Sequence, residues 1–442
     1  MAHFHEFYHT MRDGTLKHIN PFTKTEVWTV PGRGNKPISN RQTSKAHPVT
    51  EKPLTEEDFC NFCHKKMPFT PPEKERIILR DKEYQTIKIS LFEDLYQTVP
   101  LFRRVPNLFE IVTYNYWKEN YNYKIPQTLL EGKQRYLSTE PGKNHVLDVM
   151  NTKLSAANID PNGISDDEKL NDLSNPFFAG CHELIIGGKH HSEGAKSSLD
   201  MCSSGELSIE EHFHYINFTI RSMEDIFQNN RFVRYVSIFQ NWLAAAGASF
   251  DHLHKQLVGL DEWGGSIGQK IRLVRDNRNV FNELGANFAA YNDLIFAEND
   301  YALAYVDIGH RFPTLAIYSK CQEPYPSKQT EAEIRGMSEI LHACHKAMGH
   351  ELSCNEEWYY TPYDTIYVIP WHILLKWRTN IVAGFEGGTG IYINPVSPVQ
   401  TRDLMVPRLF ELRERGLISP NIRIAEESRI TKNPLLYFRS GY

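Results

Sequence analysis

Apolar residues recur at spacings of three and four along two long segments of the chain, which is the pattern of an amphipathic helix. The first segment follows the pair Ser208 and Glu211, and the second follows the pair Thr330 and Glu333. Both pairs have the spacing of a capping box and predict a helix N-terminus, while Gly349 is suited to end the second helix. The apolar stripes are Ile209, Phe213, Ile216, Ile220, Met223 and Phe227, then Ile334, Met337, Leu341, Cys344 and Met348.

Short runs of apolar and β-branched residues flank both predicted helices and indicate strands. They cover residues 183–186, 233–239 and 252–258 in the first half, and residues 313–318, 365–369 and 372–377 in the second. The order strand, helix, strand, strand therefore occurs twice, which predicts an α+β fold made of two related halves. A further short strand is expected at residues 26–30.

The domain organisation follows from this repeat. We expect an N-terminal half over residues 1–265 and a C-terminal half over residues 266–442. Residues 1–55 are rich in Pro, Gly, Asn, Lys and Arg and look loop-like. Residues 140–175 are polar with few apolar anchors, so they predict a surface insertion or lid.

Composition narrows the function. The chain of 442 residues has a net charge of −5, which argues against a broad electrostatic grip on nucleic acid, so any phosphate site must be local. No secretory signal is visible, and no segment approaches the roughly 20 apolar residues that span a bilayer. Seven cysteines, an odd number, do not suggest a disulfide framework. We therefore expect a cytoplasmic protein without nucleic-acid or membrane partners.

The segment 239–256 carries the most informative chemistry. A run of small residues includes Gly247, which lets backbone approach a ligand closely. After it, His252, His254 and Gln256 alternate with Leu253 and Lys255, and on a strand this period places the three polar side chains on one face. Such a face suits phosphoryl transfer, with one imidazole as nucleophile and neighbouring donors on the phosphate oxygens. The alternative is a strand whose polar side is merely solvated.

This segment resembles the signature of the galactose-1-phosphate uridylyltransferase branch of the histidine-triad superfamily. The resemblance implies two histidine-triad-like halves, each an antiparallel sheet with a packed helix. It implies that His254 is the nucleophile and His252 a zinc ligand, that Gln256 binds the phosphate of the intermediate, and that Ser249 and Asn241 match the family's turn serine and preceding asparagine. An amide at position 256 cannot exchange a proton near neutral pH, so the resemblance favours transfer to a phosphate acceptor over hydrolysis.

Cys60-Asn-Phe-Cys63 is a second candidate motif. Alone it could be half of a zinc site, a redox pair or chance, although no thioredoxin-like βαβ context surrounds it. In the family this motif supplies two zinc ligands, and the resemblance places His191 as the third and His252 as the fourth. Such a closed site would be structural and would aim the nucleophile strand. His190, His64 and Cys181 are rival ligands.

Further residues match the substrate site of the family. Arg33 and Lys36 match two basic residues that contact nucleotide phosphates, and Asn107 matches the asparagine of the nucleobase pocket. The sugar-phosphate end of the family's site matches Phe385, Glu386, Tyr392 and Asn394. Leu108, Asn380 and Tyr392 depart from the galactose enzymes, and the continuation through Asn394 looks closer to the ADP-glucose phosphorylase branch. His372 falls where the first half has its histidine pair, and we expect it to be a buried, hydrogen-bonded residue.

The resemblance implies a ping-pong nucleotidyltransferase that moves a nucleoside monophosphate between a nucleotide sugar and a phosphate or sugar 1-phosphate acceptor. It also implies structural zinc and a homodimer. Two alternatives remain: a dinucleoside polyphosphate phosphorylase using the same histidine, or a zinc-stabilised nucleotide-binding protein without turnover.

Overall fold

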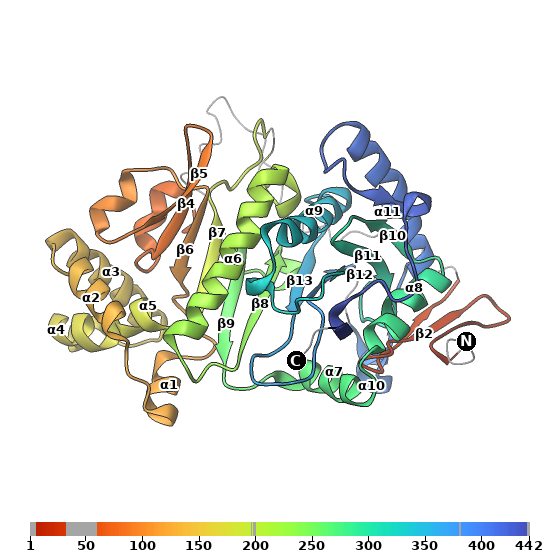
Figure 1. Ribbon diagram of the computed structural model, residues 1–442. Coiled ribbons are helices and arrows are strands. Elements are labelled where there is room, and N and C mark those ends of the chain that lie inside the picture. Colours follow the sequence, from red (N-terminus) through yellow and green to blue (C-terminus); the bar gives the residue numbers. More distant parts are fainter. Residues whose placement is uncertain (1–5, 32–59, 196, 198–199, 380–381, 440–442) are drawn as a thin grey trace.

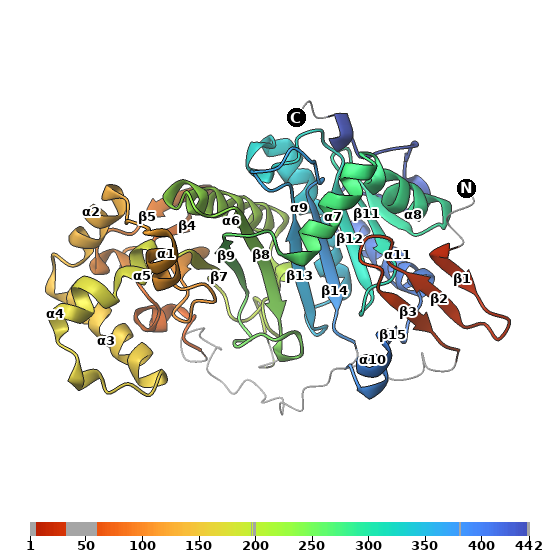
Figure 2. The same ribbon diagram turned by 90° about the horizontal axis from the view of Figure 1, so that it is seen from below.

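The computed structural model describes residues 6–31, 60–195, 197, 200–379 and 382–439. Within them, twelve strands form one continuous antiparallel sheet in the order β16-β10-β11-β12-β14-β13-β8-β9-β7-β6-β4-β5 (Figures 1 and 2). Their bounds are β4 Glu75–Arg80, β5 Glu83–Lys88, β6 Phe102–Pro106, β7 His182–Gly187, β8 Tyr235–Trp242, β9 His254–Leu260, β10 Ile295–Glu298, β11 Ala302–Asp307, β12 Thr314–Ser319, β13 Cys354–Tyr359, β14 His372–Trp377 and β16 Arg423–Ile424.

A small second sheet joins distant parts of the chain. It has the order β1-β2-β3-β15, and β15 runs parallel to β3. The bounds are β1 Tyr8–Thr10, β2 Leu16–Ile19, β3 Glu26–Thr29 and β15 Ile391–Ile393. The strand predicted at residues 26–30 is therefore confirmed, and it pairs with a strand from the far end of the sequence.

Two long helices pack on one face of the large sheet. Helix α6 (Ile209–Asn229) begins at the capping box of Ser208 and Glu211, and α9 (Glu331–Met348) begins at that of Thr330 and Glu333. Gly349, with a φ of 82°, ends α9. Both predicted helices are confirmed, and they contact each other as well as the strands beneath them.

The two halves of the large sheet repeat one arrangement, as the sequence predicts. The order β7-α6-β8-β9 recurs as β12-α9-β13-β14, and in each unit the last strand pairs between the other two. The units meet where β8 pairs antiparallel with β13, with Phe239 opposite Glu357. The fold is therefore α+β with two related halves, and their sheets are continuous.

One predicted strand is wrong. Residues 365–369 form no strand, and Ile366 is 69% exposed. The strand of this position in the repeat is β13, whose sequence Cys-Asn-Glu-Glu-Trp-Tyr is too polar to resemble a central strand. Its polar residues are tolerated because each finds a partner: Glu356, for example, accepts from Lys255 at 2.6 Å and lies 2.8 Å from His345 on α9.

The segment 140–175 is helical. It contains α3 (Glu140–Ala156) and α4 (Asp166–Glu168), and α5 (Asn175–Ala179) follows; α1 (Tyr114–Tyr121) and α2 (Gln127–Tyr136) precede it. Its apolar anchors are few but follow the helical period, and with neighbouring residues they build a separate small core of Tyr136, Val146, Val149, Met150, Leu154 and Phe177. This unit lies at the β4–β6 end of the molecule (Figure 1).

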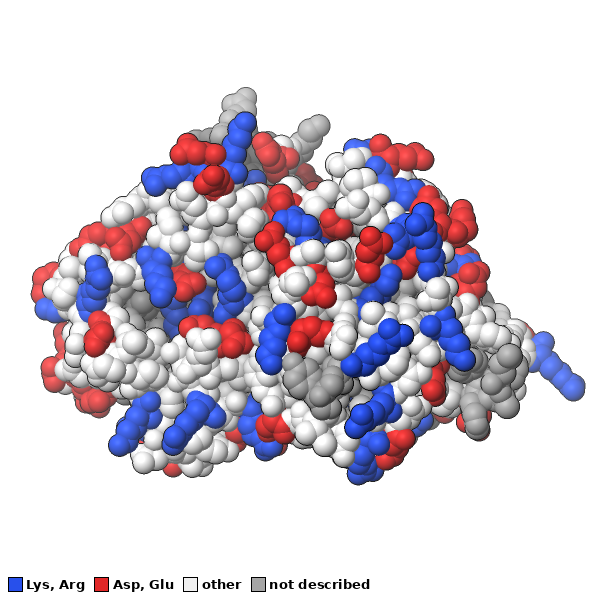
Figure 3. Space-filling model, viewed as in Figure 1, with Lys and Arg blue, Asp and Glu red and all other residues white. Residues whose placement is uncertain are grey.

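The other face of the sheet receives α7 (Gly264–Asp276), beside β13 and β14 (Figure 2). Helices α8 (Asn287–Tyr291), α10 (Gly384–Thr389) and α11 (Pro398–Glu414) complete the C-terminal half. None of the helices in the described ranges has the length and apolarity needed to cross a membrane. Acidic and basic side chains are interspersed over the face drawn in Figure 3, in keeping with the small net charge.

Candidate active site and metal centre

The histidine strand begins at the candidate nucleophile. His254 is the first residue of β9, two residues later than the sequence predicts, and its side chain is only 4% exposed. Gln256 lies opposite Phe239 of β8 in the last pair of the β8–β9 ladder. Continued by two residues, the same antiparallel register brings Asn241 opposite His254. This face is the one opposite α6 and α9, because Lys255 points the other way to Glu356 and the ring of Tyr215.

The tautomer of His254 follows from its hydrogen bond. Nδ1 lies 2.8 Å from the carbonyl oxygen of His252, and because a carbonyl only accepts, Nδ1 carries the proton. In the neutral ring, Nε2 then holds the lone pair. Burial lowers the pKa of His254 to about 4, so the ring is neutral near pH 7. The ring of Phe62 packs against it edge-on at 5.3 Å. The ring therefore has the unprotonated Nε2 that a nucleophile needs, without a general base to remove a proton.

Gln256 is oriented by His182, which is not among the predicted site residues. His182 Nδ1 accepts the backbone N–H of Ile111, so its Nε2 carries the proton and donates to Gln256 Oε1 at 3.1 Å. The Gln256 amide nitrogen is left available as a donor for another acceptor. Asn107 Nδ2 also lies 3.0 Å from His182 Nε2, so the structure brings Asn107 next to Gln256. No local motif marks His182, which reaches Gln256 only through the pairing of β7 with β9.

The turn before the strand has the geometry that its small residues allow. Gly247 adopts a φ of 88°, and the space where a Cβ would lie is open. Ser249 is exposed on this turn. Asn241 lines a neighbouring cavity of about 400 Å³, together with residues of β8, β13 and the start of α7.

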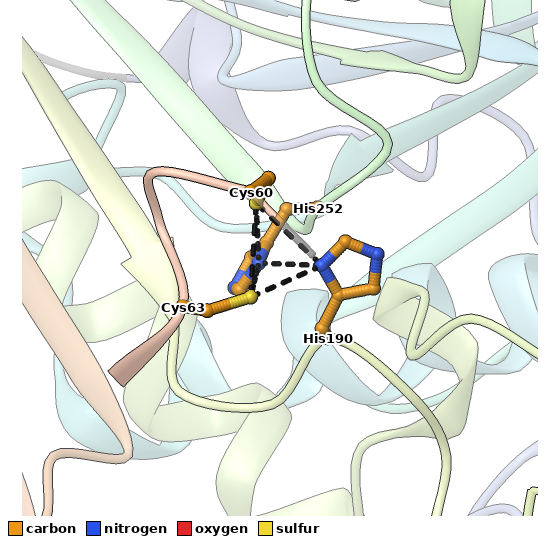
Figure 4. Close-up of side chains that lie close together, drawn as sticks. All are labelled: Cys60, Cys63, His190 and His252. Atoms are coloured by element: carbon orange, nitrogen blue, oxygen red, sulfur yellow. Dashed lines mark hydrogen bonds between the residues drawn. The ribbon is translucent and has the colours of Figure 1, made fainter. Parts of the chain in front are cut away.

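Two cysteines and two histidines form a buried cluster beside this strand (Figure 4). Cys60 and Cys63 come from the segment before the 3₁₀ turn His64–Phe69, His190 follows β7, and His252 precedes β9. Their ligand atoms all lie within 4.8 Å of one another. His252 Nε2 lies 2.7 Å from the Gly187 carbonyl oxygen and must donate to it. In the neutral ring Nδ1 is then unprotonated, and its lone pair faces the other ligand atoms of the cluster.

The spacing of these atoms fits tetrahedral zinc. Bonds of roughly 2.3 Å to sulfur and roughly 2.05 Å to nitrogen require edges of about 3.8 Å for S–S, about 3.3 Å for N–N and about 3.6 Å for S–N. The two Sγ atoms are 3.8 Å apart and the two Nδ1 atoms 3.2 Å apart. The four S–N distances are 3.5, 3.5, 3.5 and 3.9 Å. Two thiols and two imidazoles with a closed, buried geometry are the donor set of a structural zinc site.

The predicted ligand His191 is corrected to its neighbour. His190, named as a rival, supplies the fourth side chain of the cluster, whereas His191 forms an isolated bridge with Met201. The two rings lie side by side with centroids 4.6 Å apart, and it is Nδ1 of His190 that lies near Cys60, Cys63 and His252. The family pattern alone could not settle which of the adjacent histidines occupies the ligand position.

The other predicted substrate residues that the structure describes belong to α10, β15 and the residue after it. Arg33 and Lys36 fall outside the described residues. Phe385 is exposed on α10, and Glu386 caps that helix by accepting the Ala383 N–H. The Tyr392 ring on β15 lies under the Arg311 guanidinium, and the Asn394 amide donates to the His310 carbonyl.

His372 is the counterpart of His254 in the second half. Each is the first residue of the corresponding strand, and each Nδ1 donates to the carbonyl two residues earlier, at 2.7 Å to Pro370 for His372. The Nε2 atom of His372, however, lies 2.8 Å from the Lys270 amine, and the ring is fully buried between Tyr318 and Tyr359. The expectation of a buried, hydrogen-bonded histidine is confirmed.

Glu110, in the loop that carries Asn107, predicts a pH dependence of stability. Its carboxylate is 3% exposed, and burial raises its pKa to about 7. The folded protein therefore binds this proton more tightly than the unfolded chain, so the contribution to stability is complete below about pH 4.5 and is lost as the pH rises through 7. We expect Glu110→Gln to raise the free energy of unfolding at pH 8 by roughly 2–3 kcal/mol and to leave it little changed at pH 4.5.

Urea unfolding at the two pH values measures this effect. Glu168→Gln, at an exposed position on α4, is the matched control and should follow the wild type at both pH values. Identical pH dependence in Glu110→Gln and the wild type would show that the loop carboxylate does not hold its proton.

The fold, two related α+β halves that share one continuous sheet, is that of solved proteins described as GalT-like and as an ADP-glucose phosphorylase. A family model described as Domain of unknown function (DUF4921) matches residues 11–437, and the chain belongs to that family. No curated protein sequence matches the chain.

Two solved structures share the architecture. An ADP-glucose phosphorylase from Arabidopsis thaliana with bound ADP-glucose aligns with a TM-score of 0.55 and 16% identity, over 88% of this chain and 97% of that one. A GalT-like protein from the same plant aligns with a TM-score of 0.52 and 16% identity, over 88% and 98% of the two chains. At this level of identity the likeness shows a common fold.

Proposed function

We propose that this protein is a nucleotidyltransferase that carries a nucleoside monophosphate on His254. The observation that supports this most directly is the state of the imidazole. Its Nδ1 proton is held by the His252 carbonyl, and burial keeps the ring neutral, so the Nε2 lone pair is available near pH 7. His372, its counterpart in the repeat, instead has both ring nitrogens engaged.

The proposed reaction is ping-pong and balances without a proton transfer at the ring. The Nε2 lone pair attacks the α-phosphorus of a nucleotide sugar, the P–N bond forms, and the P–O bond to the sugar 1-phosphate breaks. An oxygen of the acceptor phosphate or sugar 1-phosphate then attacks the same phosphorus, the P–N bond breaks, and the neutral imidazole returns. The amide nitrogens of Gln256 and Asn241, with Ser249 and the backbone around Gly247, would hold the phosphate oxygens as charge moves between them.

Zinc held by Cys60, Cys63, His190 and His252 belongs to the proposal as a structural element. It would supply rigidity, because one of its ligands also provides the carbonyl that orients His254. We also propose a homodimer in the cytoplasm. Light scattering on the purified protein tests the dimer.

Labelled donors test the proposed function. The protein is incubated with ADP-glucose, UDP-glucose or diadenosine tetraphosphate, each labelled at the phosphate next to the nucleoside, with and without inorganic phosphate. ADP-glucose is the first choice because the solved phosphorylase of the same fold binds it. We expect an acid-labile, base-stable adduct on His254 that phosphate discharges. An adduct from diadenosine tetraphosphate alone would favour a dinucleoside polyphosphate phosphorylase, and nucleotide binding without any adduct would favour a binding protein without turnover.

A further inference from the structure

We propose that Asn355, on strand β13 of the C-terminal half, is a positioning residue that aims the Asn241 amide at the phosphate bound beside His254. This inference rests on the proposed function. Asn355 lies directly opposite Asn241 in the pairing of β13 with β8. The antiparallel register of β8 with β9, continued two residues past the Phe239–Gln256 pair, brings Asn241 opposite His254. Asn355, Asn241 and His254 therefore occupy one row across the neighbouring strands β13, β8 and β9, from the second half to the proposed nucleophile.

The orientation of the Asn355 amide is determined by its partners. Arg378 Nη1 lies 2.8 Å from Asn355 Oδ1, and because a guanidinium can only donate, this atom must be the oxygen. The amide nitrogen then faces Asn241 Oδ1 and the Ala246 carbonyl, each at 2.8 Å. Both of these partners accept, so the two amide hydrogens of Asn355 are used.

This contact fixes Asn241 as well. Its oxygen is occupied by the Asn355 donor, so its nitrogen points away from Asn355. Asn241 lines a cavity of about 400 Å³ whose other walls come from β8, β13, the start of α7 and Leu260 at the end of β9. A donor in this place suits a non-bridging phosphate oxygen. The second hydrogen, on the Ala246 carbonyl, ties the turn that contains Gly247 and Ser249 to the other half of the protein.

Exchanging the Asn355 amide for a carboxylate isolates this role. Asn355→Asp keeps the size of the side chain and an acceptor for Arg378, but it removes both hydrogens. The Asn241 amide would then turn its nitrogen to the new carboxylate and present its oxygen to the phosphate, which repels it. A hydrogen bond to a charged oxygen typically contributes a tenfold effect or more, so we expect adduct formation on His254 to slow at least tenfold.

The experiment measures single-turnover adduct formation from the labelled donor that the wild type uses, together with the thermal midpoint of each variant. The variants are Asn355→Asp, Asn241→Ala and the double variant. If Asn355 acts through Asn241, the double variant forms the adduct no more slowly than Asn241→Ala alone; a merely structural contribution would make the two effects multiply.

Asn282→Asp is the matched control. Asn282 is a buried amide of the C-terminal half that also donates two hydrogen bonds, one to Asn279 and one to the Leu435 carbonyl. It should lower the thermal midpoint without slowing the adduct per folded molecule.

The outcomes separate the two proposals. Multiplying effects, or an unchanged rate in Asn355→Asp, would overturn the positioning role and leave the nucleotidyltransferase intact. A wild type that forms no adduct with any of the three donors would overturn the proposed function and the positioning role with it.

Discussion

Replacing His254 with alanine is expected to lower the rate of nucleotidyl transfer by at least about a thousandfold, because the group that forms the P–N bond is lost. Gln256, Asn241 and the turn amides would remain, so the variant should still bind the donor. The measurement is the rate of exchange between a labelled nucleotide sugar and phosphate, with donor affinity determined separately by calorimetry. Retention of both the rate and the adduct in the alanine variant would place the chemistry elsewhere.

The second half supplies a matched control for this variant. His372→Gln removes an imidazole that occupies the same place in the repeat, while a glutamine oxygen can still accept from the Lys270 amine. We expect this variant to lose stability, since the His372 ring is packed between two tyrosine rings, but to transfer at a rate within about threefold of the wild type when corrected for folded protein. Equal losses from both replacements would indicate a general folding effect in place of a lost nucleophile.

The helices were predictable because their signals are local. Each capping box lies within four residues, and the stripe that follows repeats at every turn of the helix. Strand β13 was not predictable in this way. The buried carboxylate of Glu356 is neutralised by Lys255, which is 101 residues earlier in the chain. A partner so distant in sequence cannot be recognised from the pattern of apolar residues. The helices of segment 140–175 were not predicted, because its small core is shared with residues outside it.

The candidate active-site residues also fall into two groups, those that a local pattern predicts and those placed only by pairing between strands. His254 and Gln256 could be placed on one face because alternation along a strand is a property of the sequence itself. His182 and Asn355 orient the Gln256 and Asn241 amides only through pairing between strands, and nothing in their own surroundings distinguishes them from other polar residues. The choice between His190 and His191 required the direction of each side chain after β7, which the spacing of the motif does not contain.

Loss of the Cys and His cluster should affect both stability and rate. The cluster joins the Cys60–Cys63 segment, the segment after β7 and the residue before β9. Phe62 of the first segment packs in a small apolar core with Val105 of β6 and Leu184 and Ile186 of β7. Structural zinc sites in small domains contribute on the order of 10 kcal/mol to folding at neutral pH, although only part of that is expected where a larger sheet supports the site. We therefore expect Cys63→Ser to lower the thermal midpoint by at least about 5 °C.

The effect on rate follows from His252, which connects the cluster to the nucleophile. Its ring contributes Nδ1 to the cluster, its Nε2 donates to the Gly187 carbonyl, and its own carbonyl accepts the Nδ1 proton of His254. If the ring of His252 is no longer held, the backbone that sets the tautomer and direction of His254 is free to move. Losses of 10- to 100-fold in rate are typical when such supporting partners are removed.

Metal analysis, thermal unfolding and adduct formation should be measured together on Cys63→Ser and on Cys181→Ser, which changes a buried free thiol outside the cluster. About one zinc per chain should be found in the wild type and in Cys181→Ser and should be absent in Cys63→Ser, with the slower adduct formation confined to the last. A Cys63→Ser protein that forms the adduct at the wild-type rate would show that the strand holds its nucleophile without the cluster.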